Sequence, residues 1–200
     1  MTAAGPSRVT IRTARPEDIP AVHEIYSESV RNGTGTFAED VPTFEEMTEI
    51  VRDIQNSKWP FIVAELPHVA ESREDGSTPG DTLVIVGYAY VAQFRMRSAY
   101  RYCCEDSVYI SPSARGQGVG ASLMDRLIHE AKACGFLSIL AVIGDSRNQG
   151  SIQLHRKFGF RDVGVFKEVG LKFGQWLDVV MMQLDVQGSE EKKQELRQSA

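Results

Sequence analysis

The chain has 200 residues, enough for one ordinary domain, and its 42% hydrophobic and 24% charged residues are typical of a globular protein. A net charge of −5 offers no basic field to nucleic acid, so we expect no such partner. No apolar run approaches the roughly 20 residues of a membrane span, and the N-terminus lacks the apolar core of a signal peptide. Three cysteines, two of them adjacent, indicate neither a disulfide framework nor a CxxC metal site. We therefore expect a cytoplasmic protein without a metal or a membrane anchor.

The hydrophobic pattern predicts a mixed sequence of strands and helices. Thr43 followed by Glu46 forms a capping box at one helix start, and Gly87 predicts a kink in a long strand. The predicted strands are 9–14, 60–66, 82–94, 102–110, 136–144, 161–170 and 176–186, and the predicted helices are 15–30, 43–55, 119–135 and 148–158. This order describes one α/β (α+β) domain over residues 1–186, with a mixed central sheet of about seven strands flanked by four helices.

Two polar segments fall outside this pattern. Residues 67–81 are rich in glycine, proline and charge, which predicts an exposed hairpin insertion and not a domain boundary. Residues 187–200 form a polar C-terminal tail that we expect to be frayed or disordered.

A glycine-rich stretch, SPSARGQGVG at 111–120, joins a predicted strand to a predicted helix. Its glycines remove side chains from the approach to the helix start, where backbone N–H groups and the helix dipole can hold a phosphate. No Lys-Ser/Thr follows the glycines, so this is not a Walker loop. The loop does not follow the first strand of a βαβ unit, which disfavours a dinucleotide fold. A tight strand-to-helix turn is the other explanation of the glycines.

The pattern R-x-x-G-x-G at 115–120, between a strand and an amphipathic helix, resembles the acetyl-CoA signature of the GNAT acetyltransferases. The downstream NQGSIQLHRKFGF resembles the short helix and hydrophobic-Gly-Phe turn of that family, and the resemblance covers about residues 8–186. It implies the GNAT fold, a pyrophosphate bound by the N–H groups of the glycine loop, and a pantetheine arm between a strand and the short helix. The acetyl-CoA-binding residues that it implies are Val108, Tyr109, Ile110, Arg115, Gly116, Gln117, Gly118, Val119, Gly120, Ala121, Asn148 and Ser151.

Within this family, the chain most resembles the phosphinothricin and methionine sulfoximine/sulfone N-acetyltransferases. The matching stretches include EDSVYISPSARGQGVG, AVIGDSRNQGSIQLHRKFGF and VGLKFGQWLDVVMMQLDV, and the last is the most diagnostic because the general family does not fix it. Gly-Thr-Phe at 35–37 matches the loop that covers the substrate in that group. The resemblance implies direct acetyl transfer to the α-amine of a small amino acid or analogue, and a homodimer with the C-terminal strands near its interface.

Two residues are candidates for proton transfer. Glu105 opens the strand beside the expected cofactor cleft and matches the subgroup's glutamate, so it is the candidate base, acting directly or through a water. The alternative is a solvated glutamate at a strand end. The adjacent Asp106 is expected to point to the opposite face and is the weaker candidate. His155 lies on the buried side of its helix, where many GNAT enzymes carry a tyrosine that protonates the departing thiolate. Its role as acid or base stays open, and a satisfied core histidine is the alternative.

Two arginines are candidates for substrate binding. Arg95 and Arg97 precede Glu105 by ten and eight residues, so an extended segment would place all three on one face. Because guanidinium groups match carboxylates, we expect them to hold the α-carboxylate while Glu105 faces the α-amine. Solvated loop charge is the alternative. Weaker candidates for the pocket wall are Phe37, Lys172, Phe173 and Trp176.

Two other functions compete with this interpretation. A protein or peptide N-terminal acetyltransferase would share the fold, but its substrate has no free α-carboxylate for Arg95 and Arg97 to hold. A non-catalytic acyl-CoA-binding module is disfavoured because Glu105 and His155 are both present.

Overall fold

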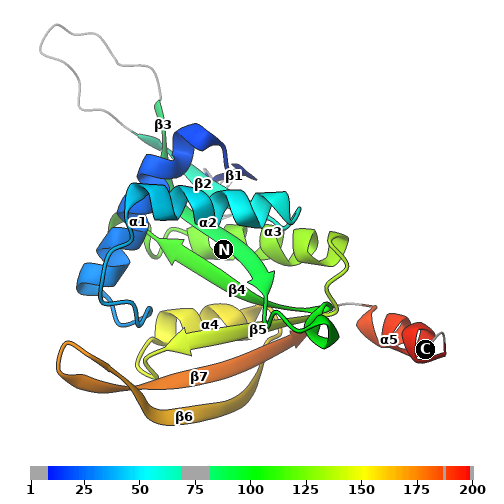
Figure 1. Ribbon diagram of the computed structural model, residues 1–200. Helices are drawn as coiled ribbons and strands as arrows, with labels where there is room; N and C mark the ends of the chain where they lie inside the picture. Colours follow the sequence, from blue (N-terminus) through cyan, green and yellow to red (C-terminus); the bar gives the residue numbers. More distant parts are fainter. Residues whose placement is uncertain (1–8, 69–81, 187, 199–200) are drawn as a thin grey trace, which may run out of the picture.

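The computed structural model describes residues 9–68, 82–186 and 188–198. They form a seven-stranded mixed sheet with the order β1-β2-β3-β4-β5-β7-β6, covered by helices on both faces (Figure 1). The strands are β1 (Thr10–Thr13), β2 (Phe61–His68), β3 (Thr82–Gln93), β4 (Cys103–Ile110), β5 (Ser138–Gly144), β6 (Arg161–Lys172) and β7 (Gln175–Asp185). The helices are α1 (Ile19–Asn32), α2 (Phe44–Asn56), α3 (Val119–Ala133), α4 (Gln149–Lys157) and α5 (Ser189–Gln198). The predicted fold class is confirmed, and so is the predicted order of strands and helices along the chain as far as β7.

The sheet is antiparallel except between β4 and β5, which run parallel. This parallel pairing extends only from Cys103 opposite Ser138 to Glu105 opposite Leu140, although both strands continue. On its other side, β4 remains paired with β3 as far as Ile110. The edge of β4 that faces β5 is therefore left without a strand partner from residue 106 onwards.

Each face of the sheet has its own apolar core. On one face, α1 and α2 pack residues such as Val22 and Met47 against Phe61 and Tyr88. On the other face, α3 buries Leu123 and its neighbours against β2, β3 and β4, and α4 packs its apolar side on β5 as part of the same cluster. One face of β5 is fully covered, since Ile139, Ala141 and Ile143 are buried, whereas on the other face Leu140 is partly buried and Val142 is 37% exposed.

Two local features agree with the sequence. The side chain of Thr43 accepts a hydrogen bond from the Glu46 N–H at 3.2 Å, and the Glu46 carboxylate accepts one from the Thr43 N–H at 2.7 Å. The pairing of β2 with β3 shifts register beside Gly87, where Ala64 pairs with Gly87 and Glu65 pairs with Ile85. The expected irregularity in β3 is thus a bulge that leaves Val86 as the extra residue.

The C-terminal tail differs from the expectation, because it forms α5 where we expected frayed chain. Glu190 in the first turn and Arg197 in the last suit the helix dipole, and Lys193 bonds to Glu190 at 2.8 Å and to Asp185 of β7 at 3.2 Å. Ion pairs within α5 and with β7 stabilise this helix, although its sequence lacks apolar periodicity. Most of the predicted insertion, residues 69–81, lies outside the described residues, and the rest belongs to β2. No helix in the described ranges has both the length and the apolar character needed to cross a bilayer.

Candidate active site

The glycine loop places a bare backbone at the start of α3. Gly116 and Gly118 have φ values of +76° and +84°, in the left-handed region that favours glycine, and a β-carbon on either would meet no described atom within 4 Å. No side chain in the described part of the chain caps the first turn of α3. The free N–H groups of this turn are therefore available to an anion such as a pyrophosphate.

Gly120 serves a different purpose in the same loop. A β-carbon there would lie 2.9 Å from Ile110 Cδ1 and 3.2 Å from Leu154 Cδ2. The third glycine thus allows α3 to pack closely against β4 and α4, which brings the anion-binding turn to the open edge of β4.

The open edge of β4 and the start of α4 border the region where β4 and β5 are no longer paired, and this region is the candidate binding cleft. Val108 and Ile110 lie on the part of β4 that has left β5. On the α4 side, Asn148 caps the helix, and its side-chain oxygen accepts a hydrogen bond from the Ser151 N–H at 3.3 Å. Unpaired strand N–H and C=O groups can bind an extended amide chain. The arrangement fits a pantetheine arm, and the glycine loop fits the pyrophosphate attached to it.

Glu105 lies where β4 and β5 separate and is half-buried. Burial raises the pKa of its carboxyl, the charge of Asp106 raises it further, and Arg95 opposes the shift. The aromatic side chains of Tyr90 and Tyr109 share its face of the sheet, because Tyr90 pairs with Ser107 and Glu105 is two residues away. A half-buried carboxyl with a raised pKa suits a proton acceptor that works near neutral pH.

Arg95 and Arg97 lie on the exposed segment that joins β3 to β4. The Gln93 side chain holds this segment, since its amide donates to the Arg95 carbonyl at 2.6 Å and to the Arg97 carbonyl at 3.3 Å. The Arg95 guanidinium lies 4.7 Å from the centre of the Phe94 ring. Both guanidinium groups are free of ion pairs within the described residues, so they are available to a carboxylate.

Phe37 lies on the loop after α1, which packs against Gly144 at the end of β5 and against Gly170 of β6. Its ring packs on Gly170 of β6, where a β-carbon would lie 2.2 Å from Phe37 Cε2. Lys172 is fully buried and donates to the carbonyls of Gly33 and Thr36, at 2.9 Å each. Lys172 therefore fixes the loop that carries Phe37, and its ammonium group faces backbone carbonyls.

Phe173 and Trp176 lie at the tip of the β6–β7 hairpin and are 52% and 62% exposed. Trp176 pairs with Leu171, whereas Gly170 and Lys172 pair with Leu177 and Gln175. Because neighbouring residues of a strand face opposite sides, Trp176 lies on the side away from Phe37. The structure therefore does not bring Trp176 together with Phe37 and Lys172.

Sequence reasoning missed Asp145, which follows Gly144 at the end of β5. It is buried, has a φ of +65°, and accepts a hydrogen bond from Thr34 Oγ1 at 2.7 Å across 111 residues of chain. The hydrogen bond from Arg147 lowers the pKa of Asp145 to about 2, against the effect of burial and with help from Thr34. The Gly-Asp pair was a signal for a turn, but nothing in the sequence indicated its distant partner.

His155 is buried in the last turn of α4 and faces β4. Its Nε2 lies 3.0 Å from Asp106 Oδ2, and its Nδ1 lies 2.8 Å from the Ser151 carbonyl oxygen. Asp106 points to the side of the sheet opposite Glu105, as predicted from the alternation of the strand, but it is buried and paired with His155. Burial alone would lower the pKa of His155, but the hydrogen bond and charge of Asp106 outweigh burial and raise it.

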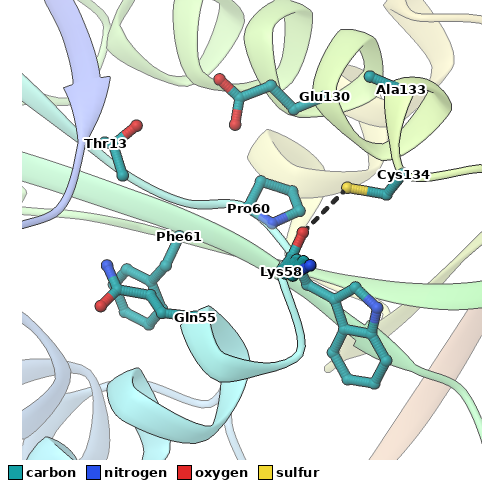
Figure 2. Close-up of a pocket in the computed structure, with 9 residues that line it drawn as sticks. Thr13, Gln55, Lys58, Pro60, Phe61, Glu130, Ala133 and Cys134 are labelled. Atoms are coloured by element: carbon teal, nitrogen blue, oxygen red, sulfur yellow. Dashed lines mark hydrogen bonds between the residues drawn. The ribbon is translucent and has the colours of Figure 1, made fainter.

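A separate pocket lies at the other end of α3 (Figure 2). Cys134 lies there, and its thiol donates to the Lys58 carbonyl at 3.3 Å. Because α3 has 15 residues, this pocket is roughly 20 Å along the helix axis from the glycine loop. It is not part of the cleft. No group of three or more potential metal-ligating residues occurs in the described part of the chain.

The model of the acetyltransferase (GNAT) family matches residues 31–160. The chain is 41% identical to the phosphinothricin N-acetyltransferase of Alcaligenes faecalis, over 87% of this chain and 81% of that protein. It is 34% identical to the L-methionine sulfoximine/L-methionine sulfone acetyltransferase of Salmonella typhimurium, over 89% and 95%. It is also similar to a GNAT superfamily phosphinothricin acetyltransferase from Sinorhizobium meliloti, solved with acetyl-CoA, with a TM-score of 0.77, 38% identity, and coverage of 90% and 89%. The sequence motifs, the cleft and these relatives agree that the chain belongs to the GNAT family of acetyltransferases.

Proposed function

We propose that this enzyme transfers the acetyl group of acetyl-CoA to the α-amine of a small amino acid or analogue of the phosphinothricin, methionine sulfoximine or methionine sulfone type. The observation that carries the proposal is the position of Glu105. It is half-buried, has a raised pKa, and lies where β4 leaves β5, within electrostatic reach of Arg95. An amino-acid head has an amine and a carboxylate a few ångströms apart, and this site offers a base and a cation.

In the proposed reaction, acetyl-CoA supplies a thioester. The N–H groups of the glycine loop hold its pyrophosphate, and the β4 edge at Val108 and Ile110 with Asn148 and Ser151 of α4 holds its arm. Glu105 accepts the proton that the substrate ammonium must lose before its nitrogen can attack. The amine nitrogen attacks the thioester carbonyl, and an N–H of the β4 edge stabilises the oxyanion of the resulting tetrahedral intermediate. When this intermediate collapses, the C–S bond breaks and coenzyme A leaves as a thiolate, which takes up the second proton that the new amide nitrogen loses. Arg95 and Arg97 hold the α-carboxylate, and Phe37 forms a wall of the pocket.

A homodimer in the cytoplasm belongs to the same proposal. β6 is an edge of the sheet and exposes a row of apolar side chains, and such a long apolar edge favours association with a second copy. The three cysteines are free thiols, as suits a reducing compartment. Light scattering tests the dimer directly, and a monomeric mass at micromolar concentration would contradict it. The exposed apolar residues of β6 are Val163, Val165, Phe166, Val169 and Leu171.

The first experiment measures acetyl-CoA consumption against a panel of acceptors. The panel holds L-methionine sulfoximine, L-methionine sulfone, phosphinothricin, several ordinary amino acids and a short peptide with a free N-terminus. We expect turnover of free amino-acid analogues and none of the peptide. Turnover of the peptide alone would replace the proposal with a protein N-terminal acetyltransferase, the function that needs no grip on a free carboxylate.

A further inference from the structure

We propose that Asp106 and His155 form a buried pair that retains one proton and fixes the distance between β4 and α4. Asp106 is then a further positioning residue of the site, and His155 acts through Asp106 and not on the substrate. The kinetic part of this inference rests on the proposed function, whereas its structural part does not.

The hydrogen-bond partners of His155 decide where its protons are. A carbonyl oxygen only accepts hydrogen bonds, so the 2.8 Å contact with Ser151 requires a proton on Nδ1. Nε2 then faces Asp106 Oδ2 at 3.0 Å, and one more proton must lie between these two atoms. With both nitrogens engaged, the imidazole has no lone pair to take the proton of a substrate amine. Loss of the shared proton would leave a buried bare carboxylate, which is costly.

Asp106 depends on His155 for its burial. Its side chain is 2% exposed and that of His155 is 4% exposed. Among the residues that the structure describes, Asp106 Oδ1 is the one buried side-chain nitrogen or oxygen without a hydrogen-bond partner. A buried carboxylate with a single protein partner stays buried only while that partner compensates its charge. Burial and the charge of Asp106 raise the pKa of Cys104 and of Glu105, and neither of these neighbours can supply a positive charge.

The pair connects β4 to α4 at the point where β4 is no longer hydrogen-bonded to β5. Asp106 is the first residue of β4 beyond the β4–β5 pairing, which ends at Glu105. His155 is one turn along α4 from Ser151, and its Nδ1 bonds to the Ser151 carbonyl. The Phe160 ring lies perpendicular to the imidazole, with ring centres 4.9 Å apart, and this contact restricts rotation of the imidazole. The pair therefore connects the two sides that would hold the pantetheine arm.

The test combines a measurement on the native protein with two variants. Nitrogen-15 NMR of protein labelled at histidine reports whether both ring nitrogens of His155 carry protons, and exposed His129 is the internal reference. Asp106→Asn and His155→Gln each remove one partner of the pair, and His129→Gln is the matched control on the surface of α3. Calorimetry with coenzyme A and kinetics with varied acetyl-CoA and varied acceptor complete the set.

We expect a doubly protonated His155 ring in the native protein at pH 7.5. Each pair variant should weaken coenzyme A binding and raise the KM for acetyl-CoA by about tenfold or more, while kcat changes less. In the double variant, the coenzyme A affinity and the KM for acetyl-CoA should be within about threefold of their values in the single variants, because either change already breaks the pair. His129→Gln should change neither the coenzyme A affinity nor the KM for acetyl-CoA.

Two results would overturn the inference. One is a His155 ring in the native protein whose single proton is on Nε2 and not on Nδ1, which can be measured even if the variants fold poorly. The other is a His155→Gln variant that binds coenzyme A normally but loses about 10²–10⁴-fold in kcat together with one ionisation of the pH profile, as a general acid or base would. A protein that binds coenzyme A as described but acetylates no amino-acid analogue would contradict the proposed function and leave the pair supported.

Discussion

The ring of Phe37 lies directly on Gly170, so that a β-carbon on Gly170 would come within 2.2 Å of Phe37 Cε2 and 2.4 Å of Cδ2. The contact joins the loop after α1 to β6, and the same loop is held by Lys172 and by the hydrogen bond between Thr34 and Asp145. The wall that Phe37 contributes to the proposed pocket thus depends on a glycine far away in the sequence.

Gly170→Ala is expected to displace Phe37 and to raise the KM for the amino-acid substrate by about tenfold, while the KM for acetyl-CoA stays within a factor of two. Gly164→Ala on the same strand is the matched control, because a β-carbon there meets no described atom within 4 Å. Steady-state kinetics with each substrate varied in turn makes the comparison. If the two variants changed the KM for the amino-acid substrate equally, the Phe37 contact would not shape the pocket.

The double variant Arg95→Ala/Arg97→Ala tests the grip on the α-carboxylate. Loss of two charge-assisted hydrogen bonds, about 1.5–3 kcal/mol each, should raise the KM for an amino acid by more than tenfold. An amine of the same shape without a carboxylate should be affected far less. Equal losses for the two acceptors would remove these arginines from carboxylate binding.

The pH dependence of kcat/KM tests Glu105. Burial and the charge of Asp106 raise the pKa of Glu105, so the active carboxylate form accumulates as the pH rises through that raised pKa, and activity should rise with it. This rise is the acidic limb of the pH profile. Glu105→Gln should remove the limb and lower kcat/KM by about 10²–10⁴-fold.

Single variants at the two arginines refine the same measurement. Arg95 opposes the increase in the pKa of Glu105, so Arg95→Ala should move the limb to higher pH. Arg97→Ala is the control and should leave the limb in place. A limb that persists in Glu105→Gln would belong to another group, and Glu105 would not be the base.

Gly118→Ala tests whether the glycine loop holds acetyl-CoA. Gly118 and Gly135 both have positive φ, +84° and +87°, and both have open space around the β-carbon position. Alanine at either should cost about 1–2 kcal/mol of stability from backbone strain alone. Only Gly118→Ala should raise the KM for acetyl-CoA, because Gly135 lies at the opposite end of α3. Thermal unfolding and kinetics of the two variants separate strain from binding.

The sequence by itself determined the strands, the first four helices, the glycine loop at the start of α3 and the alternation that separates Glu105 from Asp106. These features depend on spacing within one element: caps such as Thr43 and Glu46, apolar periodicity, and the freedom of glycine at positive φ.

Only the tertiary structure decided which distant groups meet. It paired Asp106 with His155, Phe37 with Gly170, and Thr34 with Asp145, and it turned Lys172 from an expected pocket residue into a buried anchor for the Phe37 loop. It also formed α5, through ion pairs with its own residues and with Asp185, where the polar sequence lacks apolar periodicity. Such contacts depend on how the sheet brings its edges and helices together, and a local pattern carries no information about a partner as distant along the chain as His155 is from Asp106, 49 residues.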